Sequence, residues 1–594
     1  MAGKLNFNFA SSKLFRAIAI GIVALVVMMI LGSVVSTPTL AQRPSPNGAQ
    51  VVQLVGPVSL DQDLRALPYI PPSSQTQPRL GRHPLSQNTI NAQVPSMPSQ
   101  TLAPTPKMPA PLLTFGGMTF ITSGCNCLPP DTNGDVGTNH YIQSVNSSIQ
   151  IFDKTGATLA GPTTYNSFFS AMGSSTPCGN NQNDGDGVVF FDHLADRWVV
   201  SDFAFPSFPG TSFWQCIGVS KGGNPVTSGW WLYALQVDPS NSSYLGDYPK
   251  FGLWHDAYYL SVNLFSNNTT FNGVRVYALD RNSMLNGTGA PATQALAFTI
   301  LPATLGNAYS LLPATFRFGA PPPNTPEYFL AVNSSASGGD VENQVFAWRF
   351  HPDFVTPANS TFGVGVNHAP NGTITVNSFV EAFQGSGGSY TSNLVPQTGT
   401  TALLDTLGDK LMYPLYYQNL NGVESLYATQ TVNNNQNGTG PTAIRWYQFD
   451  VTGGTIPSGA AQQQTFDNGA DGLWRWMPSL AVDVNGNLSI GYSVSSGGMN
   501  PDIRYAGRLA SDTANSLAQG EAVLISGGGH QTNSSGRWGD YSATFVDPID
   551  GCTFWHTNEY YSTTSSYIWN TRIGAFKFPS CKFSYSQLLP LIMR

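Results

Sequence analysis

The sequence predicts an all-β protein, a β-propeller of seven four-stranded blades that follows a signal peptide and a Pro-rich linker. Composition supports the fold class: charged residues make up only 10% of the chain, against the ~25% of an average soluble domain. The chain also contains 60 glycines, and aromatic residues reach 12%. Between about residues 113 and 582, strand-like runs follow one another with Gly, Asn or Pro turns and without a long amphipathic helix. These features are typical of a strand-and-turn protein.

The strand-like runs fall into sets of four, which predicts a radial repeat. The clearest set lies within residues 187–237, and further sets begin near Pro249, Pro313, Asp409, Trp474 and Arg537. Their starts are about 62, 64, 96, 65 and 63 residues apart, the near-constant period expected of a propeller. The longest interval contains the Gly/Ser-rich stretch 384–400, which we interpret as a long loop, and a weaker first set at 131–165 makes seven.

The two ends of the predicted domain are expected to meet. The last set, 537–578, shows only three clear strands, and the run 113–122 offers the missing fourth. Pairing of these segments would close the ring and leave no open sheet edge. Two packed sandwiches are the competing all-β fold, but they do not explain the regular four-strand period.

The N-terminal segment has the three parts of a secretory signal peptide. A basic start is followed by an apolar run from Ala17 to about Val35, and small residues precede a cleavage site after Ala41. We therefore expect residues 1–41 to be removed, although the run is long enough for an uncleaved membrane anchor. Residues 42–112, rich in Pro, Ser and Gln, predict a flexible linker, and 583–594 a short apolar tail.

Six cysteines agree with an oxidising, extracytoplasmic compartment. We expect Cys178–Cys216 and Cys552–Cys581 disulfides, because each pair closes a loop local to one strand group, and leave the pairing of Cys125 and Cys127 open. Zinc is the alternative, but the pair of C-x₂-C motifs that would indicate it is absent from the sequence. The net charge of −7 and the lack of a Lys/Arg cluster argue against a nucleic-acid partner.

Several long motifs resemble a group of uncharacterised bacterial secreted proteins, over essentially residues 125–581. The motifs occupy 131–141, 143–146, 191–198, 248–254, 537–542, 552–555, 558–561 and 569–574. The resemblance implies a propeller similar in broad architecture to the sialidases, and it carries no assigned reaction.

Residue types used by sialidases gather in the C-terminal third. Such enzymes need an arginine cluster for the substrate carboxylate, an acid/base carboxyl group and a tyrosine nucleophile. Candidates for catalysis are Asp540, Glu559 and Tyr560, and candidates for binding are Arg504, Arg537 and Arg572. The Arg-Ile-Pro and Asp-box motifs of sialidases are missing, however. The structural alternative is that Arg537–Asp540 and Arg572–Glu559 are ion pairs that join neighbouring strands. We expect Arg537, Asp540, Glu559 and Arg572 to lie close together.

Two further patterns suggest binding. Asp131, Asn133 and Asp135 place oxygen ligands at alternate positions, as at the start of a calcium loop, although ordinary turn chemistry explains them too. Trp474 and Trp476 flank Arg475, so that alternation in a strand puts both rings on one side, as blade core or as a stacking platform for sugars.

Taken together, these features predict a secreted or cell-surface, monomeric propeller of unassigned activity. We expect a non-catalytic module that binds an extracellular polysaccharide or a protein, without membrane attachment after signal cleavage. The alternative is a sialidase-like glycosidase on the same scaffold. Two carboxylates about 5–10 Å apart in an open pocket would favour hydrolysis, and carboxylates held by arginines would favour binding.

Overall fold

Antiparallel sheets make up most of the regular structure in the computed structural model, which confirms the all-β prediction. The structure describes residues 48–72, 106–125, 127–266, 270–288, 293–334, 341–382, 384–386, 389–434 and 440–583. By compactness the chain divides between Asn47 and Gly48, so that all described residues belong to the C-terminal unit. The expected signal peptide, residues 42–47 and 73–105 of the expected linker, and nearly all of the C-terminal tail lie outside the described residues.

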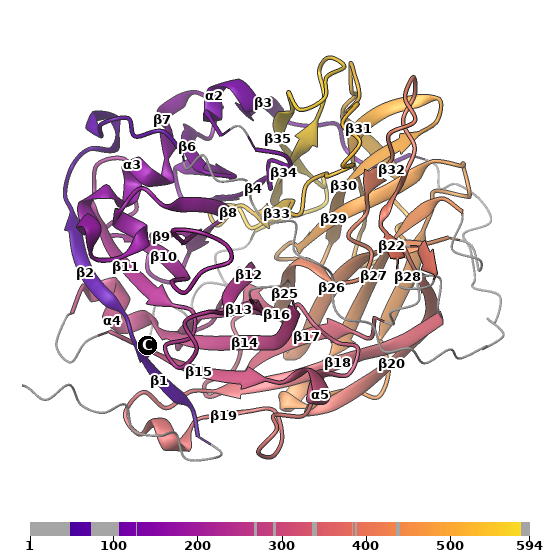
Figure 1. Cartoon of the computed structure of the whole chain (residues 1–594). Coiled ribbons are helices and arrows are strands. Elements are labelled where there is room, and N and C mark those ends of the chain that lie inside the picture. Colours follow the sequence, from indigo (N-terminus) through magenta and orange to yellow (C-terminus); the bar gives the residue numbers. More distant parts are fainter. Residues whose placement is uncertain are drawn as a thin grey trace, which may run out of the picture. The chain divides into compact units, whose positions relative to one another are not determined.

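The strands form successive antiparallel groups in chain order (Figure 1). The first three groups are β4 (Asn133–Val136), β5 (His140–Val145), β6 (Ser148–Asp153) and β7 (Thr158–Thr164); β8 (Asn183–Asp192), β9 (Arg197–Ala204), β10 (Trp214–Ser220) and β11 (Trp230–Gln236); and β12 (Leu245–Leu253), β13 (Ala257–Ser266), β14 (Thr270–Asp280) and β15 (Gln294–Ile300). The next two are β16 (Leu312–Phe316), β17 (Glu327–Val332), β18 (Val341–His351) and β19 (Thr361–Phe362); and β25 (Met412–Leu420), β26 (Val423–Asn433), β27 (Thr442–Asp450) and β28 (Gln462–Phe466). The last two are β29 (Trp474–Val482), β30 (Leu488–Ser496), β31 (Met499–Arg508) and β32 (Glu521–Ile525); and β33 (Ala543–Val546), β34 (Thr553–Tyr560), β35 (Asn570–Lys577) and β3 (Leu113–Thr119).

The first strands of these groups contact one another in a closed cycle. In order, β4 contacts β8, β8 contacts β12, and the sequence continues through β16, β25, β29 and β33 back to β4. These seven strands are called the inner strands below. The cycle closes as the sequence predicts, because β3 pairs antiparallel with β35 and places Leu113 opposite Ala575. Figure 1 shows β3 beside β35, from opposite ends of the described chain.

The fourth and fifth groups depart from the simple repeat. β20 (Gly372–Glu381) pairs with both β18 and β26, and β16 pairs in parallel with β25. The two groups therefore join in one nine-stranded sheet, within which six strands close on themselves. The stretch expected as a long loop holds the short strands β21 (Gln384–Ser386), β22 (Ser389–Thr391) and β23 (Asn393–Val395), and β23 pairs with β24 (Leu404–Asp405).

The expectation of a flexible linker is wrong for residues 48–72. β1 (Gln50–Gln53) pairs with β15, and β2 (Val55–Leu60) pairs with β11, so that this segment adds an outer strand to two consecutive groups (Figure 1). Pro57 is compatible with β2 because an edge strand needs only one row of backbone hydrogen bonds. Residues 106–112 are also attached to the sheets: the amides of Lys107 and Met108 donate to the carbonyl of Gln519.

Helices are short and lie in the connections. The α-helices are α2 (Phe120–Ser123), α3 (Tyr165–Phe169), α4 (Arg281–Asn286) and α5 (Pro302–Leu305), and the 3₁₀ helices are η1 (Leu64–Ala66), η2 (Ser170–Ser175), η3 (Pro177–Gly179), η4 (Pro357–Asn359) and η5 (Thr452–Gly454). Within the described part of the chain, no helix combines the length and apolar character needed to cross a membrane.

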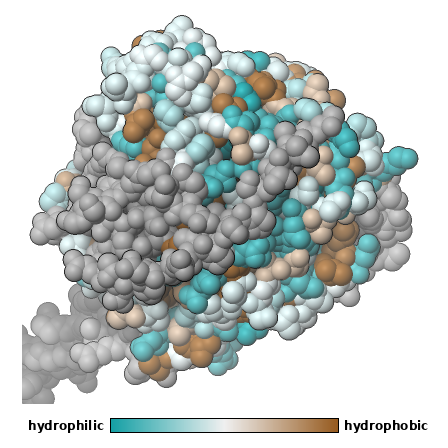
Figure 2. Space-filling model, turned by 90° about the vertical axis from the view of Figure 1, so that its right-hand side faces the viewer, coloured by the Kyte–Doolittle hydropathy of each residue, from teal (hydrophilic) through white to brown (hydrophobic). Residues whose placement is uncertain are grey.

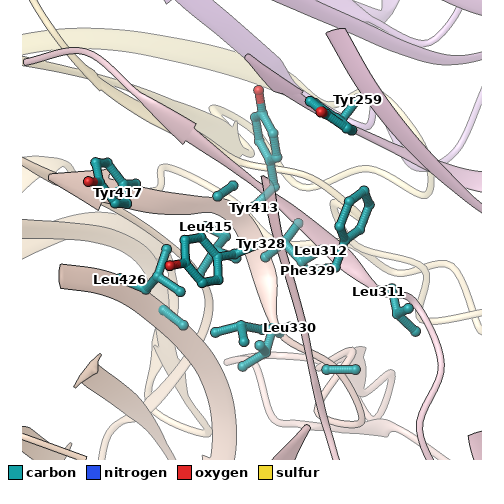
Figure 3. Packing of buried hydrophobic residues seen from close by; sticks show 14 of the residues in the cluster. Tyr259, Leu311, Leu312, Tyr328, Phe329, Leu330, Tyr413, Leu415, Tyr417 and Leu426 are labelled. Carbon is teal, nitrogen blue, oxygen red and sulfur yellow. The ribbon is translucent and has the colours of Figure 1, made fainter. Parts of the chain in front are cut away.

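Large apolar side chains fill the spaces between neighbouring groups, as expected for sheets that pack face to face. Figure 3 shows one such region, where side chains from β13, β16, β17, β25 and β26 interlock. On the face in Figure 2, apolar residues are dispersed among polar ones wherever the surface is coloured. The expected disulfides Cys178–Cys216 and Cys552–Cys581 are present, and Cys125 pairs with Cys127.

Candidate functional site

A residue with left-handed backbone recurs at the start of every inner strand. Each has a side chain, yet its φ is positive, a conformation that usually costs such a residue about 1–3 kcal/mol and concentrates at functional sites. The residues and φ angles are Asp131 (51°), Asp186 (50°), Tyr248 (55°), Ser310 (50°), Leu407 (44°), Met477 (52°) and Asp540 (66°). The inner strands lie side by side in a ring, and these residues all stand near the starts of the strands. They therefore mark one end of the ring.

The backbone feature coincides with β-bulges. Pairing shifts register between Gly185 and Val188 in β8, between Asp247 and Lys250 in β12, and between Trp476 and Ser479 in β29. A bulge inserts an unpaired residue and redirects the side chains around it. The bulges therefore explain how polar side chains at these strand starts turn toward a common region.

Charged and tyrosine side chains from five of the groups interact electrostatically at this end. We call them the ring-end cluster: Asp131, Asp186, Asp247, Tyr248, Lys250, Asp409, Lys410, Arg537, Asp540 and Tyr541. Residues almost 410 positions apart in the chain meet here, as Asp131 and Asp540 do. Most of these side chains are buried, whereas Arg537 and Asp540 keep 24% and 13% of their side-chain surface exposed and mark the open side of the cluster.

Lys250 lies between two tyrosine rings at the centre of the cluster. Its Nζ is 3.2 Å from the ring centroid of Tyr248 and 3.2 Å from that of Tyr541. The amine is buried and has no hydrogen-bond acceptor among the described residues. Burial lowers the pKa of Lys250 well below its ordinary value, against the opposing influence of Asp186, Asp540 and Asp131. The rings thus provide the cation–π contacts that replace water around the amine.

The pKa values of the aspartates around Lys250 are raised by burial and by neighbouring carboxyl groups. Burial, together with Asp540 and Asp186, raises the pKa of Asp131 well above its ordinary value, and burial and Asp540 raise that of Asp186. Burial, Asp186 and Asp540 raise the pKa of Asp247 to about 7. Like charges in a poorly hydrated region disfavour ionisation. The arrangement therefore disfavours the ionised form of these aspartates.

Hydrogen bonds fix part of the cluster. Tyr541 Oη donates to Asp186 Oδ2 at 3.0 Å, and Lys410 Nζ donates to Asp409 Oδ1 at 2.7 Å. Asn146 joins two cluster residues, because its Nδ2 donates to Asp131 Oδ2 at 2.6 Å while its Oδ1 accepts from the amide of Asp186 at 2.8 Å.

Three of the four residues expected to lie together do so. Arg537 Nη2 donates to Asp540 Oδ2 at 2.5 Å, and Glu559 Oε2 accepts from the amide of Gly539 at 3.0 Å. Burial raises the pKa of Glu559 well above its ordinary value, and Asp540 adds to this effect.

Arg572 does not belong to this arrangement. It donates to the hydroxyl and carbonyl of Thr114 on β3. The expected Arg572–Glu559 ion pair is wrong, because on β34 and β35 Glu559 lies opposite Thr571 and Arg572 lies opposite Asn558.

Tyr560 also lies away from the cluster. Side chains alternate along β34, so that Tyr560 packs in a different hydrophobic cluster from Tyr561. Tyr561 stacks on Trp538 at 5.7 Å, and its hydroxyl accepts from Gln531. The tyrosines nearest the charged residues are thus Tyr248 and Tyr541, which the sequence analysis did not select as a pair.

The predicted platform residues are mostly interior. Trp476 is fully buried and lies 5.6 Å from Trp538, while Trp474 is partly buried against the same apolar cluster. Arg475 points to the other side, as alternation predicts, and binds Asp471 and Glu521. Arg504 binds Asp502 and the same Glu521. The two arginines and their acidic partners lie within one group, whereas Trp476 packs in the apolar cluster that also contains Tyr248 and Tyr541.

The calcium-loop residues do not converge on a common point. Asn133 donates to the carbonyl of Gly187 and accepts from the amide of Val189, which ties β4 to β8. Asp135 accepts two hydrogen bonds from Arg317, at 2.6 and 2.7 Å. Asp131 alone faces the ring-end cluster. Among the described residues, no group of three or more His, Cys, Asp or Glu side chains has an arrangement suited to a metal ion.

Sequence reasoning missed Asp247, Tyr248 and Lys250. A signal was available in the repeat itself. Each inner strand has a left-handed residue near its start, and Tyr248-Pro-Lys250 aligns with Met477-Pro-Ser479. Comparing equivalent positions of the sets would have placed these residues at one end of the ring.

Comparisons with known proteins leave the function open. No protein-family model and no curated protein matches the sequence, so that the resemblance to a group of bacterial secreted proteins stays a prediction. Among solved structures, the polysaccharide lyase Uly1 is 9% identical over 89% of this chain and 99% of its own, with a TM-score of 0.37. A Trypanosoma rangeli sialidase in complex with the inhibitor DANA (9% identity, 66% of this chain, 54% of its own) and a Cellvibrio cellulosa α-L-arabinanase complexed with arabinohexaose (11%, 57% and 96%) both have TM-scores of 0.29. Such low scores give no support to a particular fold or activity.

Proposed function

We propose that the chain is an exported seven-bladed β-propeller that binds a carbohydrate at the ring-end cluster without cleaving it. The blade count rests on the closed cycle of inner strands, each followed by the remaining strands of its group. Export accords with three disulfides, which persist in oxidising compartments. In this proposal β20 is an insertion that links the fourth and fifth blades.

One observation carries the choice of binding over cleavage: the carboxyl groups predicted for catalysis are held by the protein itself. Asp540 is paired with Arg537, and Glu559 is fully buried with a backbone donor at Oε2. A glycosidase needs two carboxyl groups that reach the scissile bond from opposite sides. Glu559 does not meet that requirement, whereas the polar groups and tyrosines around Lys250 are of the kind that orient a polar ligand.

A single observation favours a glycan-cleaving hydrolase as the second candidate. Asp247 is only partly buried and has a pKa of about 7, beside Asp540. A carboxyl group that keeps its proton near neutral pH is suited to general-acid catalysis. In that case Asp247, and not Glu559, would be the acid.

The test uses the full-length exported protein and a panel of neutral, cationic and anionic polysaccharides. Calorimetry would measure binding, and release of reducing or unsaturated ends would measure cleavage. We expect binding without product, weakened by Asp540→Asn and unchanged by Asp61→Asn, which alters an exposed carboxylate. Product formation that Asp247→Asn abolishes would establish the hydrolase instead. If no polysaccharide binds, or if Asp540→Asn binds like the wild type, the proposed site is wrong.

A further inference from the structure

The ring-end cluster contains more acidic than basic side chains. It has five aspartates against Lys250, Lys410 and Arg537, and two of these basic groups already have partners within the cluster. Lys410 is bound to Asp409, and Arg537 to Asp540. The third, Lys250, is surrounded by the carboxyl groups of Asp186, Asp540 and Asp131. The excess of carboxyl groups makes this end of the ring attractive to positive charge.

An unsatisfied buried oxygen provides a second, independent observation. Asp131 is fully buried, and its Oδ2 accepts from Asn146, but its Oδ1 has no donor among the described residues. The side chain interacts with Asp540, Asp186 and Arg537, so that it faces the cluster. A buried acceptor without a donor is costly, and such groups are rare unless a ligand, water or ion completes them.

The position of Lys250 shows which kind of chemical group can lie between the rings of Tyr248 and Tyr541. Its amine nitrogen lies 3.2 Å from the centroids of both rings, which are themselves 5.3 Å apart. Aromatic faces bordered by carboxylates are the recurring environment of bound ammonium groups. An external ammonium group bound at the cluster would supply the donor that Asp131 Oδ1 lacks.

We propose that the ring-end cluster recognises a cationic glycan, an oligosaccharide of amino sugars with unacetylated amino groups. This inference rests on the proposed carbohydrate-binding function and adds its ligand class. The ammonium group of one sugar binds the carboxyl groups of Asp131 and Asp540 at the open side of the cluster. A neutral glycan would leave the surplus negative charge uncompensated, and an anionic glycan would increase it.

The pH dependence follows from the groups that face Asp247, which are Asp186, Asp540, Arg537 and Lys410. As pH rises through about 7, Asp247 loses its proton and the cluster becomes more negative. A ligand with permanent positive charge, such as a trimethylammonium derivative of a glucosamine oligomer, should therefore bind more tightly above that pH. The derivative keeps its charge, so that any change reports titration of the protein.

The decisive experiment compares a glucosamine hexamer with its fully N-acetylated counterpart and with an oligogalacturonate, using the full-length protein. The first two differ in charge at the same sugar scaffold. We expect the glucosamine hexamer to bind at least about tenfold more tightly than either of the others. Equal or tighter binding of the N-acetylated hexamer would overturn the inference but leave carbohydrate binding intact. Failure of every glycan in the wider panel would instead overturn the proposed function.

Two substitutions separate a cation site from an anion site. Lys250→Met removes the internal cation, so that it should tighten binding of the glucosamine hexamer severalfold, while Asp131→Asn should weaken it severalfold. Asp61→Asn is the matched exposed control for the carboxylate. An anion site would respond in the opposite way, with loss of oligogalacturonate binding in Lys250→Met, and this would contradict the inference. Thermal melts of each variant establish that it is folded, and Asp131→Asn decides the question if Lys250→Met does not fold.

Discussion

The ring of inner strands contains two groups of buried charges that differ in how they are balanced. Arg317 follows β16, and it reaches Asp135 on β4 although the groups of β8 and β12 lie between them in the cycle of contacts. Both oxygens of Asp135 accept from Arg317, and the amides of Val136 and Phe191 donate to them as well. At the ring-end cluster, by contrast, carboxyl groups outnumber cations and Asp131 keeps an oxygen without a donor.

The difference separates charge that holds the fold from charge that is available to a ligand. A buried ion pair such as Arg317–Asp135 contributes to a single arrangement of strands, and breaking it is costly. Charges in excess, with raised pKa values, raise the free energy of the folded protein until something binds to them. The contrast predicts that substitutions at the Arg317–Asp135 pair will mainly lower stability. Substitutions in the ring-end cluster are expected mainly to change ligand binding.

The largest effect is expected at the balanced pair. Arg317→Met should lower the free energy of unfolding by about 3–5 kcal/mol, because it leaves the Asp135 carboxyl group buried without its cation. Denaturant unfolding monitored by tryptophan fluorescence would measure the loss. Adding Asp135→Asn to this variant should restore part of the stability, since an amide needs no counter-charge. A change below about 1 kcal/mol in Arg317→Met would show that the pair does not support the fold.

A smaller effect is expected from neutralising a carboxylate in the cluster. Asp540→Asn should change the free energy of unfolding by about 1 kcal/mol or less, because loss of the Arg537 partner is offset by weaker repulsion among Asp131, Asp186 and Asp247. Asp135→Asn is the matched comparison and should cost more. Parallel thermal melts of the two variants would measure both. If Asp540→Asn proved the more destabilising, the ring-end cluster would be structural and the contrast would fail.

Much of the fold was predictable because its signals are local and repeated. Strand sets at a near-constant spacing predicted the groups, and the three-strand last set predicted that residues near 113–122 would complete it, as β3 does. Each disulfide closes a loop within one group, which is why Cys178–Cys216 and Cys552–Cys581 could be selected.

The strands that sequence analysis missed are those without a local signal. β1 and β2 lie in a Pro-containing segment and pair with strands 150 or more residues away, so that only the exposed edges of β15 and β11 specify them. β20 likewise joins two groups, and the sheet it completes depends on distant partners.

The candidate site was predictable only in part, since its members come from different repeats. Arg537 and Asp540 are close in sequence, and their ion pair is confirmed. Lys250 reads as an ordinary charged residue at a strand start, and its environment arises from Tyr541, which lies almost 300 residues further along the chain. Tyr560 was selected because sequence alone does not show which face of β34 points toward the charges.

The smallest effect is a change in how stability depends on pH. The pKa of the Asp247 carboxyl group rises from 3.8 in the unfolded chain to about 7 in the folded protein. The folded state therefore binds this proton more tightly than the unfolded state does, so that Asp247 stabilises the protein at low pH. That contribution is lost as pH rises from about 4 through about 7, and no more is lost above this range.

Asp247→Asn has no such proton, and its free energy of unfolding should decline less than that of the wild type between these two pH values. Denaturant midpoints at several pH values would measure the two slopes. Asp61→Asn is the control, because Lys221 lowers the pKa of Asp61 and so places its effect below this window. Identical slopes in wild type and Asp247→Asn would mean that folding does not raise the pKa of Asp247, and the contrast between the two groups of buried charges would lose this support.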